Sequence, residues 1–329
     1  MTSAAVTPDP AITTASAEAA LGGKPERTRA DRVKQRLTSP WATLAAIVIA
    51  LLWTVPTFGL FLSSFRPADQ IGTTGWWTFF TDPQLTLDNY GEVLFSSSSS
   101  SPQLGEYFMN SLLISIPGTL IPLVLASLAA YAFAWVKFKG SSTLFVIVFA
   151  LQIVPLQMAL IPLLQLFVTF LQPFQNGLHE IMPFVSEKQF LPVWIAHTIF
   201  GLPLAIFLLH NFISEIPGEV IEAARVDGAG HGQIFFRIIL PLAMPAIASF
   251  GIFQFLWVWN DLLVALVFSS GTPDTAPLTQ RLAELAGSRG ENWERLTAGA
   301  FVSLIVPLAV FFGLQRFFVR GLLAGSAKG

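Results

Sequence analysis

Residues 222–245 read EAARVDGAGHGQIFFRIILPLAMP. The stretch starts as a short polar segment, turns at Gly228 and continues into a second, amphipathic turn. Long apolar stretches lie on both sides of it. Because apolar stretches of that length cross a lipid bilayer as helices, we expect a short polar helix and a glycine turn at one face of a membrane protein.

The composition points to the same class of protein. Of the 329 residues, 53% are hydrophobic and 12% are charged, whereas a soluble domain carries about 25% charged residues. The formal net charge is −2, so no overall basic field would attract nucleic acid. The chain has no cysteine, which excludes disulfides, thiolate metal sites and cysteine catalysis.

Six stretches are apolar for about 20 residues or more, the length that crosses a hydrocarbon layer of about 30 Å. Strict alternation over about 10 residues, as in a β-barrel, is not found. We therefore predict an all-α membrane domain over 41–329, preceded by a disordered cytoplasmic tail over 1–40. A cleaved signal peptide is the alternative for the start of the chain, but Trp41–Leu62 is too long for one. The six predicted spans lie near 42–64, 110–136, 143–170, 191–213, 241–268 and 297–319.

Lysine and arginine set the expected orientation. The first 40 residues, the second and fourth loops and the C-terminus are rich in them, whereas the first and third loops hold only Arg66 and Lys188. The positive-inside rule then puts both termini and residues 222–228 in the cytoplasm. The three arginines of the fifth loop argue against this orientation, but the charges of the other segments support it, and we follow those.

The first loop, 65–108, is the longest loop expected outside the cell. Its cluster of four aromatic residues between Trp76 and Phe80 is typical of a helix at the membrane interface, and sugar binding is the alternative. The serine run Ser96–Ser101 is predicted to be a flexible insertion.

The polar segment before Gly228 has the features of a short, rigid helix. Pro217 suits the first helical turn, and Glu222 can pair with Arg225 at i+3. Gly228 follows as a left-handed C-cap, and Asp227 could cap the next turn. A helix lying on the membrane surface would need a wider apolar face and more basic residues. We therefore expect a short, rigid surface helix on which a partner protein can dock.

The order Glu-Ala-Ala, Asp-Gly-Ala and Ile-x-Leu-Pro resembles the permease subunits of ATP-driven importers. In that family this segment, about 216–230 here, is the coupling helix that docks on the ATPase. The resemblance carries a coupling role to six residues of this chain, namely Glu222, Ala223, Ala224, Asp227, Gly228 and Ala229.

Further motifs are similar to the smaller permease of maltose-type and α-glucoside-type importers. They are Phe108–Ser111, Ala130–Ala134, Phe138–Gly140, Trp259–Asp261, Asn292–Gly299 and the end from Gln315 to Gly329. The resemblance implies a type I importer fold and a multi-pass place in a bacterial inner membrane. It also implies four partners: a second, larger permease, two ATPase subunits and an extracytoplasmic sugar-binding protein. This chain would bind no cofactor, because ATP and Mg belong to the ATPase.

The C-terminal tail has two interpretations. In the family it reaches toward the ATPase dimer, which would make Gln315, Arg316, Arg320 and Lys328 contact residues. The alternative is a basic anchor beside the membrane.

Polar residues inside the predicted spans are candidates for the translocation path. Exposing such groups to lipid costs free energy, so they usually line a path or an interface. Hydrogen bonding between helices is the alternative for all of them. His197 and His210 lack metal-ligand spacing and are predicted to be packing residues. The path candidates are Asn110, Gln152, Gln157, Gln165, Asn260 and Asp261.

The sequence contains no GxxxxGK[ST] loop, nucleophile elbow or HExxH motif, so we expect a transport subunit and no catalysis. The leading hypothesis is import of a di- or oligosaccharide such as maltose, trehalose or sucrose. A secondary sugar carrier would need an internal repeat, and a permease for a non-sugar solute stays open. A membrane-embedded glycosyl-transfer enzyme would need acidic residues at a membrane face. In the maltose-type family the main membrane sugar site lies in the partner permease, so this chain is expected to contact sugar little.

Because the chain lacks cysteine, single introduced cysteines report its orientation. A cysteine replacing Ser98 should be labelled by an impermeant maleimide on whole cells, and one replacing Gly230 should be labelled only after lysis. Labelling of position 230 on intact cells would reverse the predicted orientation.

Overall fold

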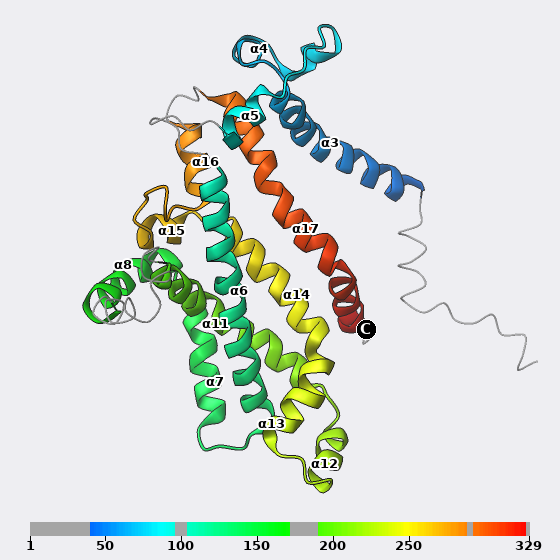
Figure 1. The fold of residues 1–329 in the computed structure, drawn as a ribbon. Helices are drawn as coiled ribbons and strands as arrows, with labels where there is room; N and C mark the ends of the chain where they lie inside the picture. The colour runs from blue at the N-terminus through cyan, green and yellow to red at the C-terminus, as the bar shows by residue number, and fades with distance from the viewer. Residues whose placement is uncertain (1–39, 96–103, 172–189, 288–291, 327–329) are drawn as a thin grey trace, which may run out of the picture. The chain divides into compact units, whose positions relative to one another are not determined.

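The computed structural model describes residues 40–95, 104–171, 190–287 and 292–326, with side chains as far as Gln315 (Figure 1). Every regular element in these ranges is helical. The chain divides into two units, Met1–Gly59 and Leu60–Gly329. The predicted tail and the serine run lie outside the described residues.

The described part of the first unit, 40–59, lies wholly in helix α3, Pro40–Ser64, whose last residues belong to the second unit. Only 6% of its most apolar stretch is buried. Exposed residues such as Trp41, Leu52 and Trp53 suit contact with lipid, which replaces water as the solvent here.

Five helical stretches in the described ranges are long and apolar enough to cross a membrane, and a bent pair brings the count to as many as six. The predicted number of six is reached when the bent pair counts as one span. The five are α3, α6 (Leu104–Trp135), α11 (Leu191–Ser214), the continuous run His231–Trp259 and Trp293–Gln315 of α17 (Trp293–Ser326).

The bent pair corrects the predicted continuous third span, 143–170. Helix α7 (Ser141–Ala150) and the 3-10 turn η2 (Leu151–Ile153) lead to Pro155, where the chain bends by 107° into α8 (Leu156–Leu166) and the π-turn η3 (Phe167–Leu171). Proline lacks a backbone N–H and excludes the helical conformation at the residue before it. Val154 is accordingly extended, with ψ of 118°.

The predicted fifth span, 241–268, is also too long. The helix formed by α13 (His231–Ile234), η4 (Phe235–Ile239) and α14 (Leu240–Trp259) ends at Asn260, and a separate short helix, α15, follows over Leu263–Phe268. The Asp261 carboxylate accepts the backbone N–H groups of Val264 at 3.0 Å and Ala265 at 3.2 Å. The Asp261 side chain, one residue before the N-cap residue Leu262, therefore bonds to the start of a new helix where hydropathy alone predicts continuation.

Small residues allow α6, α11 and α14 to pack closely at the centre of the second unit. A methyl group added at Gly118 would lie 3.2 Å from Val258, and one added at Gly201 would lie 2.7 Å from the Gln254 amide. That amide is buried and donates to the Gly118 carbonyl at 3.2 Å. Glycines at such crossings bring backbones together where no water drives association.

Within the described ranges, four short helices lie in the segments before α6 and before α17 (Figure 1). They are α4 (Ala68–Thr73), η1 (Trp76–Phe80), α5 (Asp88–Phe95) and α16 (Leu278–Ala286). Two of them, α5 and α16, lie near the N-terminus of α6. The aromatic cluster forms the single 3-10 segment η1, whose Trp77 and Phe80 are exposed. Arg66 is buried and donates to the hydroxyl groups of Thr74 and Thr78, so this predicted loop cation is a structural residue.

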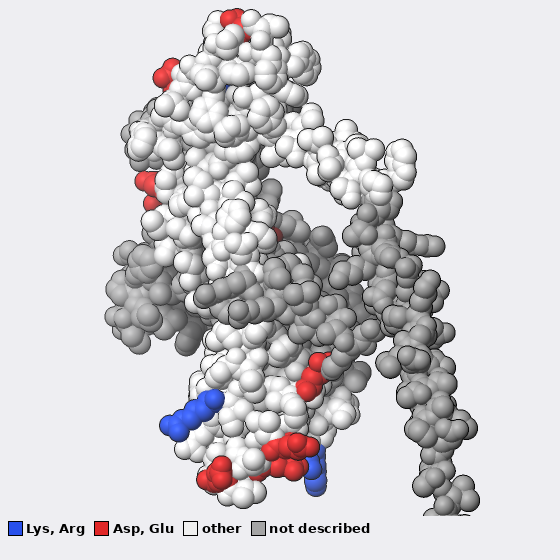
Figure 2. Space-filling view, turned by 90° about the vertical axis from the view of Figure 1, so that its right-hand side faces the viewer, with Lys and Arg blue, Asp and Glu red and all other residues white. Residues whose placement is uncertain are grey.

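Charged side chains lie mainly toward the two ends of the face shown in Figure 2, and a broad, nearly uncharged zone separates them. Such a distribution fits a chain whose middle lies in hydrocarbon, where ionised groups are costly.

Gly201→Ala should destabilise the fold, because the new methyl group displaces the Gln254 amide from a buried hydrogen bond. We expect a loss of about 1–3 kcal/mol, seen as a lower temperature at which the detergent-solubilised chain loses its gel-filtration peak. Gly313→Ala is the matched control, since nothing lies within 4 Å of a methyl group there. Equal melting of the two variants would contradict the proposed close packing at Gly201.

Candidate functional site

The predicted coupling segment forms helix α12, Gly218–Val226, at one end of the second unit (Figure 1). Pro217 is its N-cap residue, with φ of −57°, and Glu219 lies in the first turn. The fixed φ of proline and an acid beside the positive end of the helix dipole both favour a helix start here.

Gly228 ends α12 in the left-handed conformation predicted for it, with φ of 81°. Two backbone hydrogen bonds close the turn: Gly228 N–H to Arg225 O at 3.0 Å and Ala229 N–H to Ala224 O at 2.9 Å. This pair is the Schellman motif, which satisfies carbonyl groups at a helix end and strongly favours glycine at the left-handed position. The turn is therefore fixed by backbone geometry.

Two local predictions about this segment are wrong. Asp227 does not cap the next turn: it is the C-cap residue of α12. The N-cap residue of α13 is Gly230, whose N–H donates to the Gln233 side chain at 3.1 Å. No ion pair joins Glu222 and Arg225, both of which the structure describes. Arg225 donates instead to the Trp135 carbonyl at 3.3 Å, at the end of α6.

The inner side of α12 is anchored in a buried apolar cluster. Ile221 and Ile234 are each 1% exposed, and they pack in one cluster with Leu209 and Ile213 of α11 and Ala130 of α6. Burying one isoleucine side chain contributes about 1.5–3 kcal/mol. A close-packed contact of this kind resists deformation, so α12 is held firmly against the ends of α6 and α11.

Hydrogen bonds reinforce this anchor at its edge. The indole N–H of Trp135 donates to the Ile213 carbonyl at 3.3 Å, which ties α6 to α11. The Tyr131 hydroxyl and His231 Nδ1 lie 2.9 Å apart and are hydrogen-bonded, which ties α6 to α13.

The outer side of α12 is free of intramolecular cover. Val226 is 88% exposed and Val220 is 40% exposed. Of the six predicted coupling residues, four are exposed and two, Ala224 and Ala229, are half-buried. Short side chains and exposed valines around Glu222 make a surface that a partner can approach closely.

The predicted tail contacts are described only in part. Gln315 is exposed on α17, and Arg316 and Arg320 lie within the same helix. Lys328 lies outside the described residues.

Three of the path candidates have structural bonds. Asn110 is fully buried, and its amide donates to the Pro273 carbonyl at 2.8 Å and the Ala276 carbonyl at 3.1 Å. The Asn260 amide donates to Leu256 O at 2.7 Å, one turn earlier in its own helix. The Asp261 side chain bonds to the start of α15 as described above and lies 3.8 Å from His197 Nε2. These contacts give all three a role in holding the fold.

Of the two histidines predicted to be packing residues, His197 is buried and His210 is half-buried. His197 is 1% exposed, with its ring centroid 5.6 Å from that of Trp257. His210 Nε2 lies 3.3 Å from Ser214 Oγ. No group of three His, Cys, Asp or Glu side chains among the described residues is placed to hold a metal ion.

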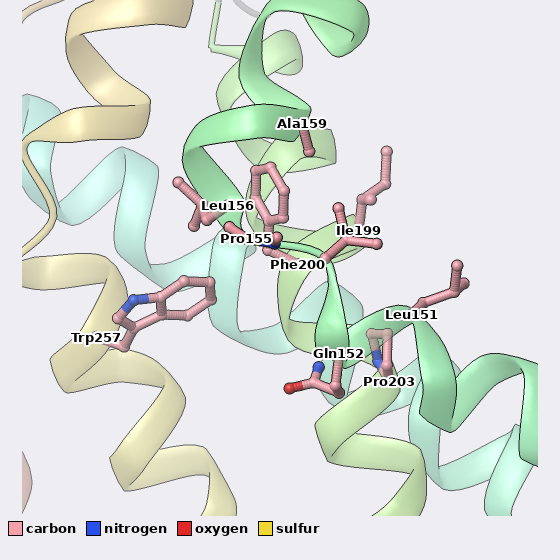
Figure 3. Close-up of a pocket in the computed structure, with 10 residues that line it drawn as sticks. Leu151, Gln152, Pro155, Leu156, Ala159, Ile199, Phe200, Pro203 and Trp257 are labelled. Atoms are coloured by element: carbon pink, nitrogen blue, oxygen red, sulfur yellow. The ribbon is translucent and has the colours of Figure 1, made fainter.

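A pocket of about 430 Å³ lies beside the bend between η2 and α8 (Figure 3). Gln152 lines it, whereas Gln157 and Gln165 are exposed elsewhere on the broken span. Phe200 of α11 and Trp257 of α14 form other parts of its wall. The sequence analysis did not single out these two aromatic residues, because an aromatic residue in an apolar helix carries no signal by itself.

Comparison with known proteins places this arrangement in a family. Residues 118–323 match the family described as binding-protein-dependent transport system inner membrane component. A permease of Synechocystis sp., named for uptake of osmoprotective compounds, is 54% identical over 89% of this chain and 95% of its own length. An α-glucoside transport system permease of Rhizobium meliloti is 41% identical over 88% of this chain and 97% of its own.

A solved structure supports the fold. A bacterial ABC transporter that imports alginate has a chain that aligns with a TM-score of 0.59 at 20% identity, over 88% of this chain and 99% of its own. Members of the family are non-catalytic membrane components. With the matched family region and these full-length relatives, the chain belongs to the inner membrane components of binding-protein-dependent transport systems, the permeases of ABC importers.

Proposed function

We propose that this chain is one of two unlike permeases of an importer for α-glucosides, with di- or oligosaccharides such as maltose, trehalose or sucrose as substrates. The name of the Rhizobium relative, an α-glucoside permease, supports this substrate class. The name of the Synechocystis relative favours a second candidate, an osmoprotective solute that need not be a sugar.

The observation that carries the transport mechanism is the rigid end of α12. Its Schellman turn holds Gly228 at φ of 81°, and Ile221 anchors the helix in the core. In our proposal the outer side of α12 sits in a cleft of an ATPase subunit. Two such subunits bind ATP with Mg, close on each other and carry the coupling helices of both permeases along.

The buried cluster then passes this motion into the membrane. Because α12 packs with α6 and α11 through Ile221 and Ile213, a displacement of α12 tilts these helices as a body. The permease pair alternates between an inward-open and an outward-open arrangement, and an extracytoplasmic binding protein delivers the solute to the latter. The tail residues Gln315, Arg316, Arg320 and Lys328 are proposed as a second contact with the ATPase.

Gly228→Val should break coupling without preventing insertion. A β-branched residue in the left-handed conformation costs about 1–2 kcal/mol, and its side chain enters the docking surface. We expect loss of the ATPase stimulation that loaded binding protein produces in the reconstituted complex. Gly228→Asn, which tolerates this conformation, should keep most of the stimulation.

Gly230→Val is the matched control, because Gly230 has φ of −76° and open space around it. It should retain stimulation, and co-purification of the ATPase checks assembly of each variant. Full stimulation in an assembled Gly228→Val complex would rule out this segment as the coupling joint.

Glu222→Ala should weaken the same joint more mildly. Glu222 is exposed and has no ion-pair partner among the described residues, so its carboxylate is available to a donor on the ATPase. One charge-assisted hydrogen bond contributes about 1.5–3 kcal/mol. We expect a reduced affinity of ATPase for the permease pair, measured by titration, with a normal maximal rate. An unchanged affinity would remove Glu222 from the contact.

The substrate class is tested on the binding protein and the complex. Purification of this chain in mild detergent should bring down an ATPase and a second, larger permease. The cognate binding protein should melt at a higher temperature with maltose, trehalose or sucrose. Stabilisation by glycine betaine and by none of the three sugars would favour the osmoprotectant candidate and overturn the α-glucoside assignment.

A further inference from the structure

Three distant parts of the chain converge on the pocket beside the broken span. The bend from Leu151 to Ala159 forms one side, α11 contributes Ile199, Phe200 and Pro203, and α14 contributes Trp257. Its volume of about 430 Å³ falls within the range of small-molecule sites, about 300–1,000 Å³. None of the lining residues is charged, so the pocket suits a neutral ligand.

Trp257 differs from the other tryptophans of α6, α11 and α14. The indole N–H groups of Trp135, Trp194 and Trp259 donate to the backbone carbonyls of Ile213, Leu113 and Ser303. Among the described residues Trp257 has no such acceptor. Its ring is set by the edge of His197, 5.6 Å away, and points toward Phe200 and Gln152 (Figure 3). A half-buried tryptophan that is not bonded to the scaffold is available to a ligand.

Polar groups lie opposite this aromatic side. The Gln152 amide points toward the side of the pocket where Trp257 lies (Figure 3), and it has no hydrogen-bond partner among the described residues. An amide supplies both donors and acceptors. A lipid chain would leave this group unsatisfied in hydrocarbon, which is unfavourable.

Backbone groups at the bend add to this polarity. Helix α8 has Pro155 as its N-cap residue and no side-chain cap. The first hydrogen bond into the helix is donated by Met158 to the Pro155 carbonyl at 3.0 Å. The N–H groups of Leu156 and Gln157 lie ahead of this bond, and such groups need partners from outside the helix.

We propose that this pocket is a saccharide subsite carried by this chain. A neutral pyranose ring packs its C–H face against Trp257 and Phe200, and its hydroxyl groups bond to the Gln152 amide and to backbone at the bend. The combination of aromatic faces, an uncharged amide and free backbone groups matches a polyol and matches neither an ion nor a lipid tail. This inference rests on the proposed transport of sugar and adds a contact in this subunit, where the sequence led us to expect little.

Protection of introduced cysteines tests the subsite directly. Ile199→Cys puts a thiol in the pocket wall, and Ile161→Cys puts one on α8 outside it; both positions are exposed. The full complex is reconstituted with each variant, with maltose, trehalose and sucrose as probes. N-ethylmaleimide labelling of this chain is followed on gels, without nucleotide and after trapping with ADP and vanadate. Any of the three sugars that the wild type transports should slow labelling at position 199 and not at 161.

Pocket variants in the Ile199→Cys background give the second readout. Gln152→Leu should raise the sugar concentration for half-protection about 3- to 10-fold, the effect of one lost uncharged hydrogen bond. Gln165→Leu, a matched change at an exposed position of α8 outside the pocket, should leave it unchanged. Trp257→Leu should raise it at least as much as Gln152→Leu, and Trp257→Phe, which keeps an aromatic face, should restore most of the protection.

The outcomes separate the subsite from the function on which it rests. A wild-type complex that transports none of the three sugars counts against the proposed function and the subsite together. Transport with unprotected labelling at position 199 in both states overturns the subsite alone. So does failure of position 199 to label in the assembled complex, because another subunit then fills the pocket. Equal half-protection in the Gln152→Leu and Gln165→Leu complexes also overturns it.

Discussion

The need to satisfy every backbone polar group inside hydrocarbon governs this structure. Long stretches of the second unit meet this need by staying helical, and the two places where the helices break are handled differently. At Asp261 the carboxylate accepts the first N–H groups of α15, and the Asp261 carbonyl accepts the Thr279 hydroxyl at 2.6 Å. At Pro155 no side chain caps α8. The second break therefore leaves polar backbone beside the pocket, where a ligand or water can bond to it.

The same need explains why buried polar side chains brace the helix crossings. The Gln254 amide bonds to the Gly118 carbonyl, and Asn110 bonds to the carbonyls of Pro273 and Ala276. Each bond joins residues more than 100 positions apart, so each fixes one helix against another segment. These bonds and the glycines beside them make the centre of the second unit a connected body. The anchor of α12 joins this body through Ile221.

Local rules predicted some features of the coupling segment and missed others. Gly228 was predicted to be left-handed because glycine alone adopts that conformation at little cost after a helix, and φ of 81° confirms it. The predicted Glu222–Arg225 ion pair was wrong, because Arg225 bonds to the Trp135 carbonyl instead. That carbonyl is distant in sequence, so a rule about residues three positions apart does not include it. The third and fifth spans were predicted as unbroken because hydropathy averages over about 20 residues and hides a single proline or aspartate. The roles of the six coupling residues and of Gln152 stay predictions.

The sequence by itself determined that the chain is an all-helical membrane protein, where its apolar stretches lie, and which glycine ends the coupling helix. These properties depend on length, composition and backbone conformation, which are local. Only the tertiary structure decided that Asn110 and Asp261 hold the fold and that Gln152, Phe200 and Trp257 share one pocket. Between Gln152 and Trp257 the chain forms α8, α11, α12, α13 and most of α14. Their approach depends on the bend at Pro155 and on the packing of α11 against α14. A contact between side chains of different helices depends on how those helices cross, and a local sequence pattern does not predict it.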